Sequence, residues 1–244
     1  MYRLDNKFTR GRWSVTIAGC GGTGGFVAEG LCRLLPDKAN IILVDHDRVE
    51  ERNLGRQNFT GGELGMFKSE ALAVRLSSRY GRPVAYSTLP IAMVDASLPG
   101  LIIGCLDNGP ARRAIAGIRG MIGSPYQCTS WWIDAGNGEN YGQVLIGNYH
   151  EAAFDPDICL ALPLPTIQSP ELLAQAPQRR SCAEMDEQGP TINQAVASLV
   201  VEAARRLIEG TCHWMQLYLD LETGTLYPVM ATPETAKRIT KVTM

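Results

Sequence analysis

The chain has 244 residues and a formal net charge of −2, and 45% of its residues are hydrophobic. This near-neutral balance gives no electrostatic reason to expect nucleic acid or an anionic membrane as a general partner. No run approaches the roughly 20 apolar residues that a membrane helix needs, and the polar N-terminal stretch does not resemble a signal peptide, so we expect a cytoplasmic protein.

Seven cysteines are spread along the chain, and no two of them form a CxxC pair. This spacing argues against a disulfide framework and against a zinc site built from four thiolates. We therefore predict no structural zinc.

The first half of the chain predicts strands that alternate with helices. Short apolar runs that end in Gly or Asp indicate buried strands, and the segments between them have helical spacing. The predicted elements are strands at 14–19, 40–47 and 100–107, and helices at 25–35, at Lys68 to Tyr80 and from Pro110 onward. This order is typical of an α/β fold with a mostly parallel sheet and helices on both faces.

The second half is less regular. Strand-like pieces and glycine turns follow residue 124, and the proline-rich segment 151–190 predicts a long crossover loop over the site. A helix is predicted at 191–209, then a hairpin at 214–230 and a loosely held polar tail from Thr232. We expect one domain over 1–244, with a nucleotide-binding core at about 12–150 and the last helix and hairpin at 191–231.

The loop "GCGGTGG" supplies the pattern Gly19-x-Gly21-x-x-Gly24 between a predicted strand and a predicted helix. Gly19 permits a tight turn, Gly21 lets the backbone approach phosphate, and Gly24 lets the helix pack on the strand. Asp45 ends the next strand, where a carboxylate can accept hydrogen bonds from a ribose. A turn used only for packing is the alternative, and it does not explain five glycines in seven residues.

Two classes of nucleotide remain open at this point. A dehydrogenase needs a catalytic residue further along the chain, and none of His46, His150 and His213 lies in a recognisable catalytic context. Arg48, near the end of the second strand, is a candidate for binding NADP, although single surface arginines are common.

Four segments together resemble the ThiF/MoeB family and the adenylation domains of ubiquitin-activating enzymes. These segments are "GCGGTGG", "LVDHDRVEERNLGRQNF", "GMFKSEA" and "CLDNGPARR". The resemblance covers residues 14–120 and returns from Cys182 to Gly210. It implies a Rossmann-like three-layer α/β/α fold with antiparallel C-terminal strands. It also implies ATP-dependent adenylation of the C-terminal carboxylate of a small ubiquitin-like or sulfur-carrier protein.

The resemblance also implies roles for individual residues. Arg56 and Lys68 would supply cations for the phosphates, and Asp107 would bind Mg²⁺. The other residues expected to bind the nucleotide or to shape its site are Gly22, Asp45, Asp47, Asn53, Gln57 and Asn108. Each catalytic role has a plain alternative. Lys68 can be an exposed residue in a first helical turn, Arg56 a surface ion-pair partner, and Asp107 an N-cap for the helix at Pro110.

Relatives in the family provide further expectations. Some pass the activated carboxylate to a cysteine, and Cys182 is the candidate acceptor, with Cys128 a weaker one. Arg179 and Arg180 would favour the Cys182 thiolate, whereas Glu184 and Asp186 would oppose it.

An arginine that reaches the site of a partner subunit is expected at Arg10 or Arg12, and we expect a homodimer. The pair Trp131–Trp132 is either an exposed interface or ordinary core. The short N-terminus and the lack of paired cysteines most resemble the ThiF-related proteins of PRTRC plasmid cassettes.

Two other functional classes stay open. One is an NAD(P)-dependent oxidoreductase, and the set Arg56, Lys68 and Asp107 argues against it. The other is a catalytically silent ThiF-like module that binds nucleotide and recruits partners.

Overall fold

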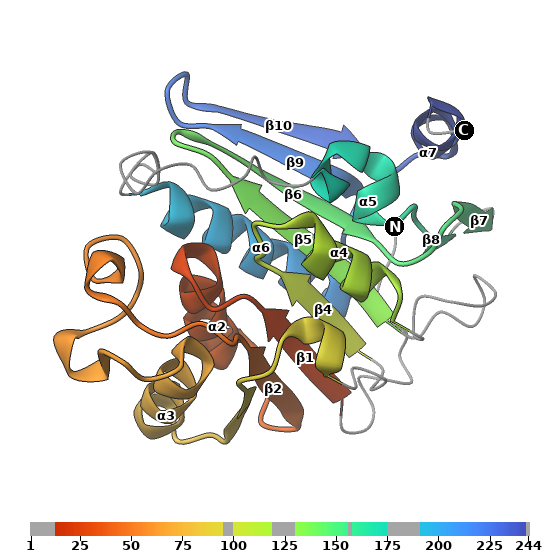
Figure 1. Ribbon diagram of the computed structural model, residues 1–244. Coiled ribbons are helices and arrows are strands. Elements are labelled where there is room, and N and C mark those ends of the chain that lie inside the picture. Colours follow the sequence, from red (N-terminus) through yellow and green to blue (C-terminus); the bar gives the residue numbers. More distant parts are fainter. Residues whose placement is uncertain (1–12, 95–99, 119–129, 156–157, 175–190, 243–244) are drawn as a thin grey trace.

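The computed structural model describes residues 13–94, 100–118, 130–155, 158–174 and 191–242 (Figure 1). An eight-stranded sheet runs through these residues in the order β10-β9-β6-β5-β4-β1-β2-β3. The strands are β1 Trp13–Ala18, β2 Ala39–Val44, β3 Val84–Ser87, β4 Gly100–Gly104, β5 Ser130–Asn137, β6 Tyr141–Gly147, β9 Trp214–Asp220 and β10 Thr225–Met230.

The sheet has a parallel part and an antiparallel part. Strands β3, β2, β1, β4 and β5 are parallel, whereas β6, β9 and β10 continue the sheet in antiparallel fashion from β5. The predicted α/β fold with antiparallel C-terminal strands is therefore confirmed. Pro228 lies in β10, at the edge of the sheet, where a residue without an N–H group is tolerated.

Helices cover both faces of the sheet and make three layers (Figure 1). Helices α2 Gly22–Leu34, α3 Lys68–Tyr80 and α6 Ile192–Glu209 pack on one face, and α4 Gly109–Ala116 and the short α5 Pro165–Gln168 pack on the other. Each face has its own cluster of buried apolar side chains. Alternation along the strands explains this division, because successive side chains point to opposite faces.

Trp131 and Trp132 illustrate the alternation. Trp131 is 5% exposed and belongs to the core under α2 and α6, whereas Trp132 is 0% exposed and belongs to the core under α4. The pair is therefore core on both faces of β5, and it does not form an exposed patch.

Three parts of the chain differ from the prediction. Strand β3 was not predicted, because its alternation is short and only Val84 in it is buried. The proline-rich segment 151–190 contains β7 Ala153–Asp155, β8 Ile158–Ala161, α5 and the 3-10 helix η6 Pro170–Leu173. The polar tail forms α7 Pro233–Val242, which packs against α5.

The last two differences have a common physical reason. The segment after β8 is held by contacts with distant parts of the sheet, which local composition does not reveal. The side-chain amide of Gln168 donates to the carbonyls of Ile146 and Pro163 at 2.7 and 2.6 Å. Leu164 is fully buried, and Ala236 buries one side of α7 in the same way.

No helix in the described ranges is both long and apolar enough to cross a lipid bilayer.

The order of the strands reverses next to β1. From β1 the chain continues through β2 and β3 on one side, and β4 and β5 lie on the other side. In open parallel sheets, the carboxyl ends of strands at such a reversal form a crevice that binds ligands. The functional residues predicted from the sequence follow β1, β2 and β4, so the fold brings their segments to this crevice.

Candidate functional site

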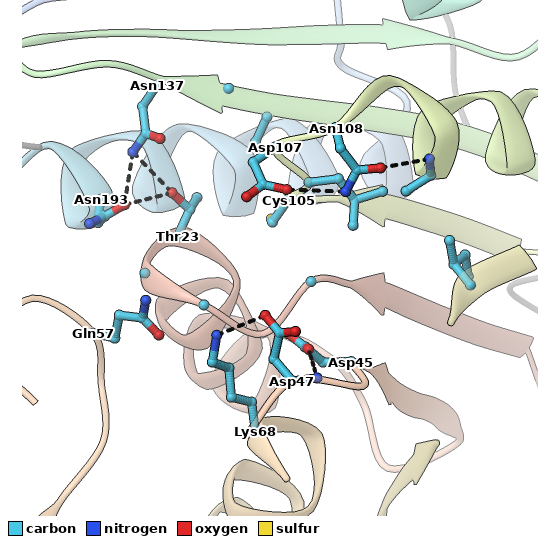
Figure 2. Close-up of a pocket in the computed structure, with 18 of the residues that line it drawn as sticks. Thr23, Asp45, Asp47, Gln57, Lys68, Cys105, Asp107, Asn108, Asn137 and Asn193 are labelled. Atoms are coloured by element: carbon cyan, nitrogen blue, oxygen red, sulfur yellow. Dashed lines mark hydrogen bonds and ion pairs between the residues drawn. The ribbon is translucent and has the colours of Figure 1, made fainter. Parts of the chain in front are cut away.

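A cavity of about 1080 Å³ opens at this edge of the sheet (Figure 2). Its lining includes each of these predicted residues: Gly19, Gly21, Gly22, Asp45, Asp47, Asn53, Arg56, Gln57, Lys68, Asp107 and Asn108. Small-molecule sites typically occupy roughly 300–1,000 Å³, so the cavity has room for a nucleotide and part of a second substrate.

The glycine loop has the geometry that its sequence predicts. Gly19 has φ +88°, and a Cβ there would overlap the carbonyl oxygen of Cys105. A Cβ on Gly24 would overlap the carbonyl oxygen of Gly19, so the helix packs directly on the turn. Gly21 faces the cavity, where the nearest atoms to a Cβ would be those of Gln57 at 3.8 Å. Gly22 begins α2 and packs against Asn193 at the start of α6.

Asp45 connects the glycine loop to the end of β2. Its carboxylate accepts hydrogen bonds from the main-chain N–H groups of Cys20 at 2.6 Å and Asp47 at 2.8 Å. Burial raises the pKa of Asp45, while these two N–H groups and nearby Lys68 act to lower it. The carboxylate thus fixes the shape of the loop and also lines the cavity.

Lys68 begins α3 and is only 8% exposed, so it is not the exposed helix residue of the plain alternative. Its ammonium lies 3.1 Å from Oδ2 of Asp47. Burial of the side chain removes the freedom of a surface lysine, and the charge is held at the wall of the cavity.

The segment that carries Asn53, Arg56 and Gln57 forms the 3-10 helix η1 Glu51–Asn53 and the turn that follows it. Asn53 is buried, and its Oδ1 accepts from the N–H of Glu50 at 2.9 Å, so this oxygen shapes the backbone. The Gln57 N–H donates to the carbonyl of Asn53 at 2.8 Å. The side-chain oxygen of Gln57 is buried beside Gly21 without a hydrogen-bond partner in the described part of the chain. Such a buried acceptor indicates a ligand donor or water at this point. Arg56 is half-buried in the same wall.

Asp107 and Asn108 have different structural roles: Asn108 caps a helix, and Asp107 presents its carboxylate to the cavity. Asn108 is the N-cap of α4, because its Oδ1 accepts from the N–H of Ala111 at 2.9 Å. The N-cap alternative for Asp107 therefore does not hold. Asn108 Nδ2 also donates to Oδ1 of Asp107 at 3.1 Å, which orients that exposed carboxylate. Figure 2 shows Asp107 and Asn108 across the cavity from Lys68 and Asp47.

The sequence did not single out three polar residues that also line the cavity. Asn137 Nδ2 donates to Asn193 Oδ1 at 2.8 Å and to Thr23 Oγ at 3.2 Å, and Thr23 Oγ donates to Asn193 Oδ1 at 3.1 Å (Figure 2). The three residues come from β5, α6 and α2. The only local signal was the position of Thr23 within the glycine loop.

The sequence also gave no reason to pair Arg112 with Asp134. Arg112 on α4 donates from Nε to both carboxylate oxygens of Asp134 on β5 at 3.1 Å. Burial raises the pKa of Asp134 to about 6, although the Arg112 guanidinium acts to lower it. Gly104 faces Asp134 in the sheet and leaves room for this pair, because a Cβ there would lie 3.1 Å from Oδ1.

Within the described residues, Asp45, His46 and Asp47 form one group whose ligand atoms lie within 4.8 Å of one another. Asp45 already accepts two main-chain hydrogen bonds, and Asp47 pairs with Lys68. The predicted acceptor Cys182, with Arg179 and Arg180, lies outside the described residues. Cys128, Arg10 and Arg12 also lie outside them.

The family model described as "ThiF family" matches residues 9–235. The chain belongs to the ThiF family. The proteins with a similar sequence include "Ubiquitin-like modifier-activating enzyme 5" of Drosophila grimshawi. It is 33% identical over 119 residues, which are 42% of this chain and 29% of that protein. The chain thus spans less than a third of that relative's length.

Two solved structures have the same fold as this ThiF-family chain. The microcin C7 biosynthetic enzyme MccB, in complex with N-formylated MccA, superposes with a TM-score of 0.64 at 16% identity. The match covers 89% of this chain and 64% of that one. E. coli MccB with ATP superposes with a TM-score of 0.60 at 15% identity, and the match covers 89% and 63% of the two chains.

Proposed function

We propose that this ThiF-family chain binds ATP in the cavity and adenylates the C-terminal carboxylate of a small ubiquitin-like or sulfur-carrier protein. The observation that carries this proposal is the convergence of Lys68, Arg56 and Asp107 with the glycine loop around one cavity. A site for hydride transfer does not need two cations and a carboxylate gathered at the phosphate end of a nucleotide.

The proposed reaction moves the adenylyl group from pyrophosphate to the substrate. A carboxylate oxygen attacks the α-phosphorus of ATP, and the bond from that phosphorus to the oxygen bridging to the β-phosphorus breaks. The products are an acyl-adenylate and pyrophosphate. Two anions must approach one another and charge develops on the leaving group, so the site needs fixed cations and N–H donors.

The residues of the cavity fit these needs. The first residues of α2 line the cavity, and the free N–H groups and positive dipole end of a helix N-terminus favour an anion there. Lys68 and Arg56 stabilise negative charge on the phosphates, and the buried oxygen of Gln57 orients a donor beside Gly21. Asp45 and Asp47 lie where the ribose binds in folds of this type.

Asp107 is the residue proposed to hold Mg²⁺. It presents an exposed carboxylate to the cavity, and Asn108 fixes one of its oxygens. Mg²⁺ usually binds proteins through one or two carboxylates together with substrate phosphates, so the donor set fits the ion. When bound, Mg²⁺ neutralises charge on the phosphates and polarises the reacting phosphorus.

ATP–pyrophosphate exchange tests the proposal, with small proteins that end in Gly-Gly as candidate substrates. We expect exchange with the wild-type chain and a loss of about 100-fold or more in Lys68→Ala and Arg56→Ala variants. Arg79→Ala is the matched control, because Arg79 lies on the same helix as Lys68 and is exposed in an ion pair with Glu29. Near-normal exchange in both site variants would contradict the assignment, and ATP binding without exchange would instead favour a silent binding module.

Two finer points belong to the same proposal. Cys182 is the proposed acceptor of the activated carboxylate, and a thioester that survives Cys182→Ser would exclude it. We also propose a homodimer that works with a small ubiquitin-like protein of a PRTRC-type cassette. Light scattering of the purified chain tests the dimer, and a monomeric mass at micromolar concentration would rule it out.

A further inference from the structure

Arg112 is a buried cation at the wall of the cavity, and it has no role in the reaction proposed above. Its side chain is 8% exposed and its partner Asp134 is fully buried. Nε donates to both oxygens of Asp134, so one edge of the guanidinium is fixed.

The other edge of the guanidinium has donors to offer. Among the residues that the structure describes, no hydrogen-bond acceptor is found for Nη1 or Nη2 of Arg112. Nη2 lies beside Gly136, at 3.8 Å from the position of a Cβ there, and Gly136 has no side chain to cover it. Both residues line the cavity. A guanidinium fork matches a ligand with two oxygens in one plane.

The position of Arg112 separates it from the phosphate-binding residues. Its partner Asp134 lies on β5, two strands away from β1, which leads into the glycine loop. Two strand spacings amount to about 10 Å. Lys68 and Arg56 lie on the β1–β2 side, and Asp107 follows β4, between the two sides. An anion held by Arg112 therefore lies beyond Asp107 from the glycine loop.

The negative side chains near Arg112 also favour a role for this cation in binding an anionic substrate. Asp107 and Glu139 also line the cavity, so an incoming carboxylate meets two negative side chains there. Arg112 is the cation held against β5 that can offset this repulsion.

We propose that Arg112 binds the reacting carboxylate of the acyl substrate, while Asp134 holds the guanidinium in the orientation that this requires. This inference rests on the proposed function, because it assumes that the second substrate is a carboxylate. During adenylation one carboxylate oxygen forms the bond to phosphorus, and the Arg112 fork retains the other, which becomes the carbonyl oxygen of the acyl-adenylate.

Isothermal titration calorimetry tests the proposal on the full chain saturated with α,β-methylene ATP, which cannot react. The probes are a synthetic peptide that ends in Gly-Gly with a free carboxylate and the same peptide with a C-terminal amide. We expect the wild-type chain to bind the acid roughly tenfold or more tightly than the amide. This preference is lost in Arg112→Gln, whereas the affinity for the ATP analogue stays within about twofold of wild type.

Two further variants keep the test clean. Arg112→Gln leaves Asp134 as a buried charge without a partner, which can disrupt folding. The double variant Arg112→Gln/Asp134→Asn removes both charges, keeps a side-chain hydrogen bond possible, and is expected to lose the preference as well. Arg113→Gln is the matched control, because Arg113 lies on the same helix and donates to the Leu173 carbonyl at the surface. It should keep the preference.

Equal binding of acid and amide by the wild-type chain, or no binding of either, overturns the proposal. So does a variant that weakens the ATP analogue but keeps the preference for the acid, because Arg112 would then bind phosphate. Pyrophosphate exchange separates the two proposals. If the double variant exchanges pyrophosphate at the rate of the wild-type chain and with the same KM for the acid peptide, the role of Arg112 is refuted and the proposed function stands. Preference for the acid without exchange would refute the proposed function alone.

Discussion

The ammonium of Lys68 lies 3.1 Å from the carboxylate of Asp47, and the main-chain N–H of Lys68 donates to the Asp47 carbonyl at 2.8 Å. The two side chains differ sharply in exposure, at 10% for Lys68 and 59% for Asp47. An ammonium has three donors, and Asp47 occupies one of them. The pair therefore aims a buried cation at the cavity and uses an exposed anion to hold it there.

Asp47→Asn and Lys68→Ala should have different effects. Because Asp47 is exposed, its ion pair contributes less than about 1 kcal/mol, so Asp47→Asn should change the free energy of unfolding by less than that. Lys68→Ala should lower pyrophosphate exchange by about 100-fold or more, since it removes a cation from the phosphates. Urea unfolding and exchange assays check both expectations. A larger loss of exchange in Asp47→Asn than in Lys68→Ala would show that the acid, and not the lysine, acts on the substrate.

Gly19→Ala should destabilise the fold and abolish nucleotide binding together. An alanine at φ +88° is strained, and its Cβ would overlap the carbonyl of Cys105, so we expect a loss of at least about 2 kcal/mol. Gly55→Ala is the matched control, because no atom lies within 4 Å of a Cβ there and its φ is not positive. Thermal unfolding with and without ATP measures both effects. A Gly19→Ala variant as stable as Gly55→Ala would show that the turn is not constrained in this way.

Gly22 and Asn193 should show strong coupling in a double-mutant cycle. A Cβ on Gly22 would lie 2.5 Å from Asn193 Nδ2, so Gly22→Ala must displace the Asn193 amide from its hydrogen bonds with Thr23 and Asn137, which should cost about 1–3 kcal/mol. Asn193→Ala removes the obstacle, so Gly22→Ala should cost much less in that background. Additive effects on the free energy of unfolding would mean that the Asn193 side chain is not the obstacle to a Cβ at position 22.

Asp134 should make the stability of the chain depend on pH. Burial raises the pKa of Asp134 to about 6, whereas an aspartate in an unfolded chain titrates near 3.9. The folded state thus binds more protons between these values, so the free energy of unfolding falls as the pH rises through this window. From pH 4.5 to pH 7 the contribution of this one group should fall by about 2 kcal/mol.

Asp134→Asn provides the control for this effect, because asparagine does not titrate. Urea unfolding of both proteins at pH 4.5 and pH 7 should show a larger loss of stability in the wild-type chain than in the variant. Parallel changes in the two proteins would place the pKa of Asp134 near its ordinary value.

The sequence predicted the parts of the site that lie close together along the chain. The glycine loop, the start of the helix at Lys68 and the turn at Asp107 each depend on local chemistry. A positive φ requires glycine, and a helix needs an N-cap. The sequence does not decide between Asp107 and Asn108 as the N-cap of α4, because both residue types are good caps. Only the hydrogen bond from the N–H of Ala111 to Asn108 distinguishes them.

Contacts between distant segments could not be predicted in this way. Thr23 and Asn193 are 170 residues apart, and Arg112 and Asp134 come from a helix and a strand with no shared periodicity. For the same reason, the composition of the proline-rich segment after residue 151 predicts a loop, whereas the structure contains helices and strands there. The composition of a segment indicates only its local conformational preference, whereas Gln168 and Leu164 are held in place by contacts with the strands beneath them.

The hydrogen bonds that join Thr23, Asn137 and Asn193 also set the order in which the site can be completed during synthesis. The glycine loop, Asp45, Lys68 and Asp107 are all synthesised within the first half of translation. The wall opposite them is closed only when α6 docks on α2, and β9 must then add to the sheet beside β6. A nascent chain that stops short of residue 192 would carry nearly every signature residue and still lack a finished pocket. Full ATP affinity should therefore be among the last properties that the newly made protein acquires.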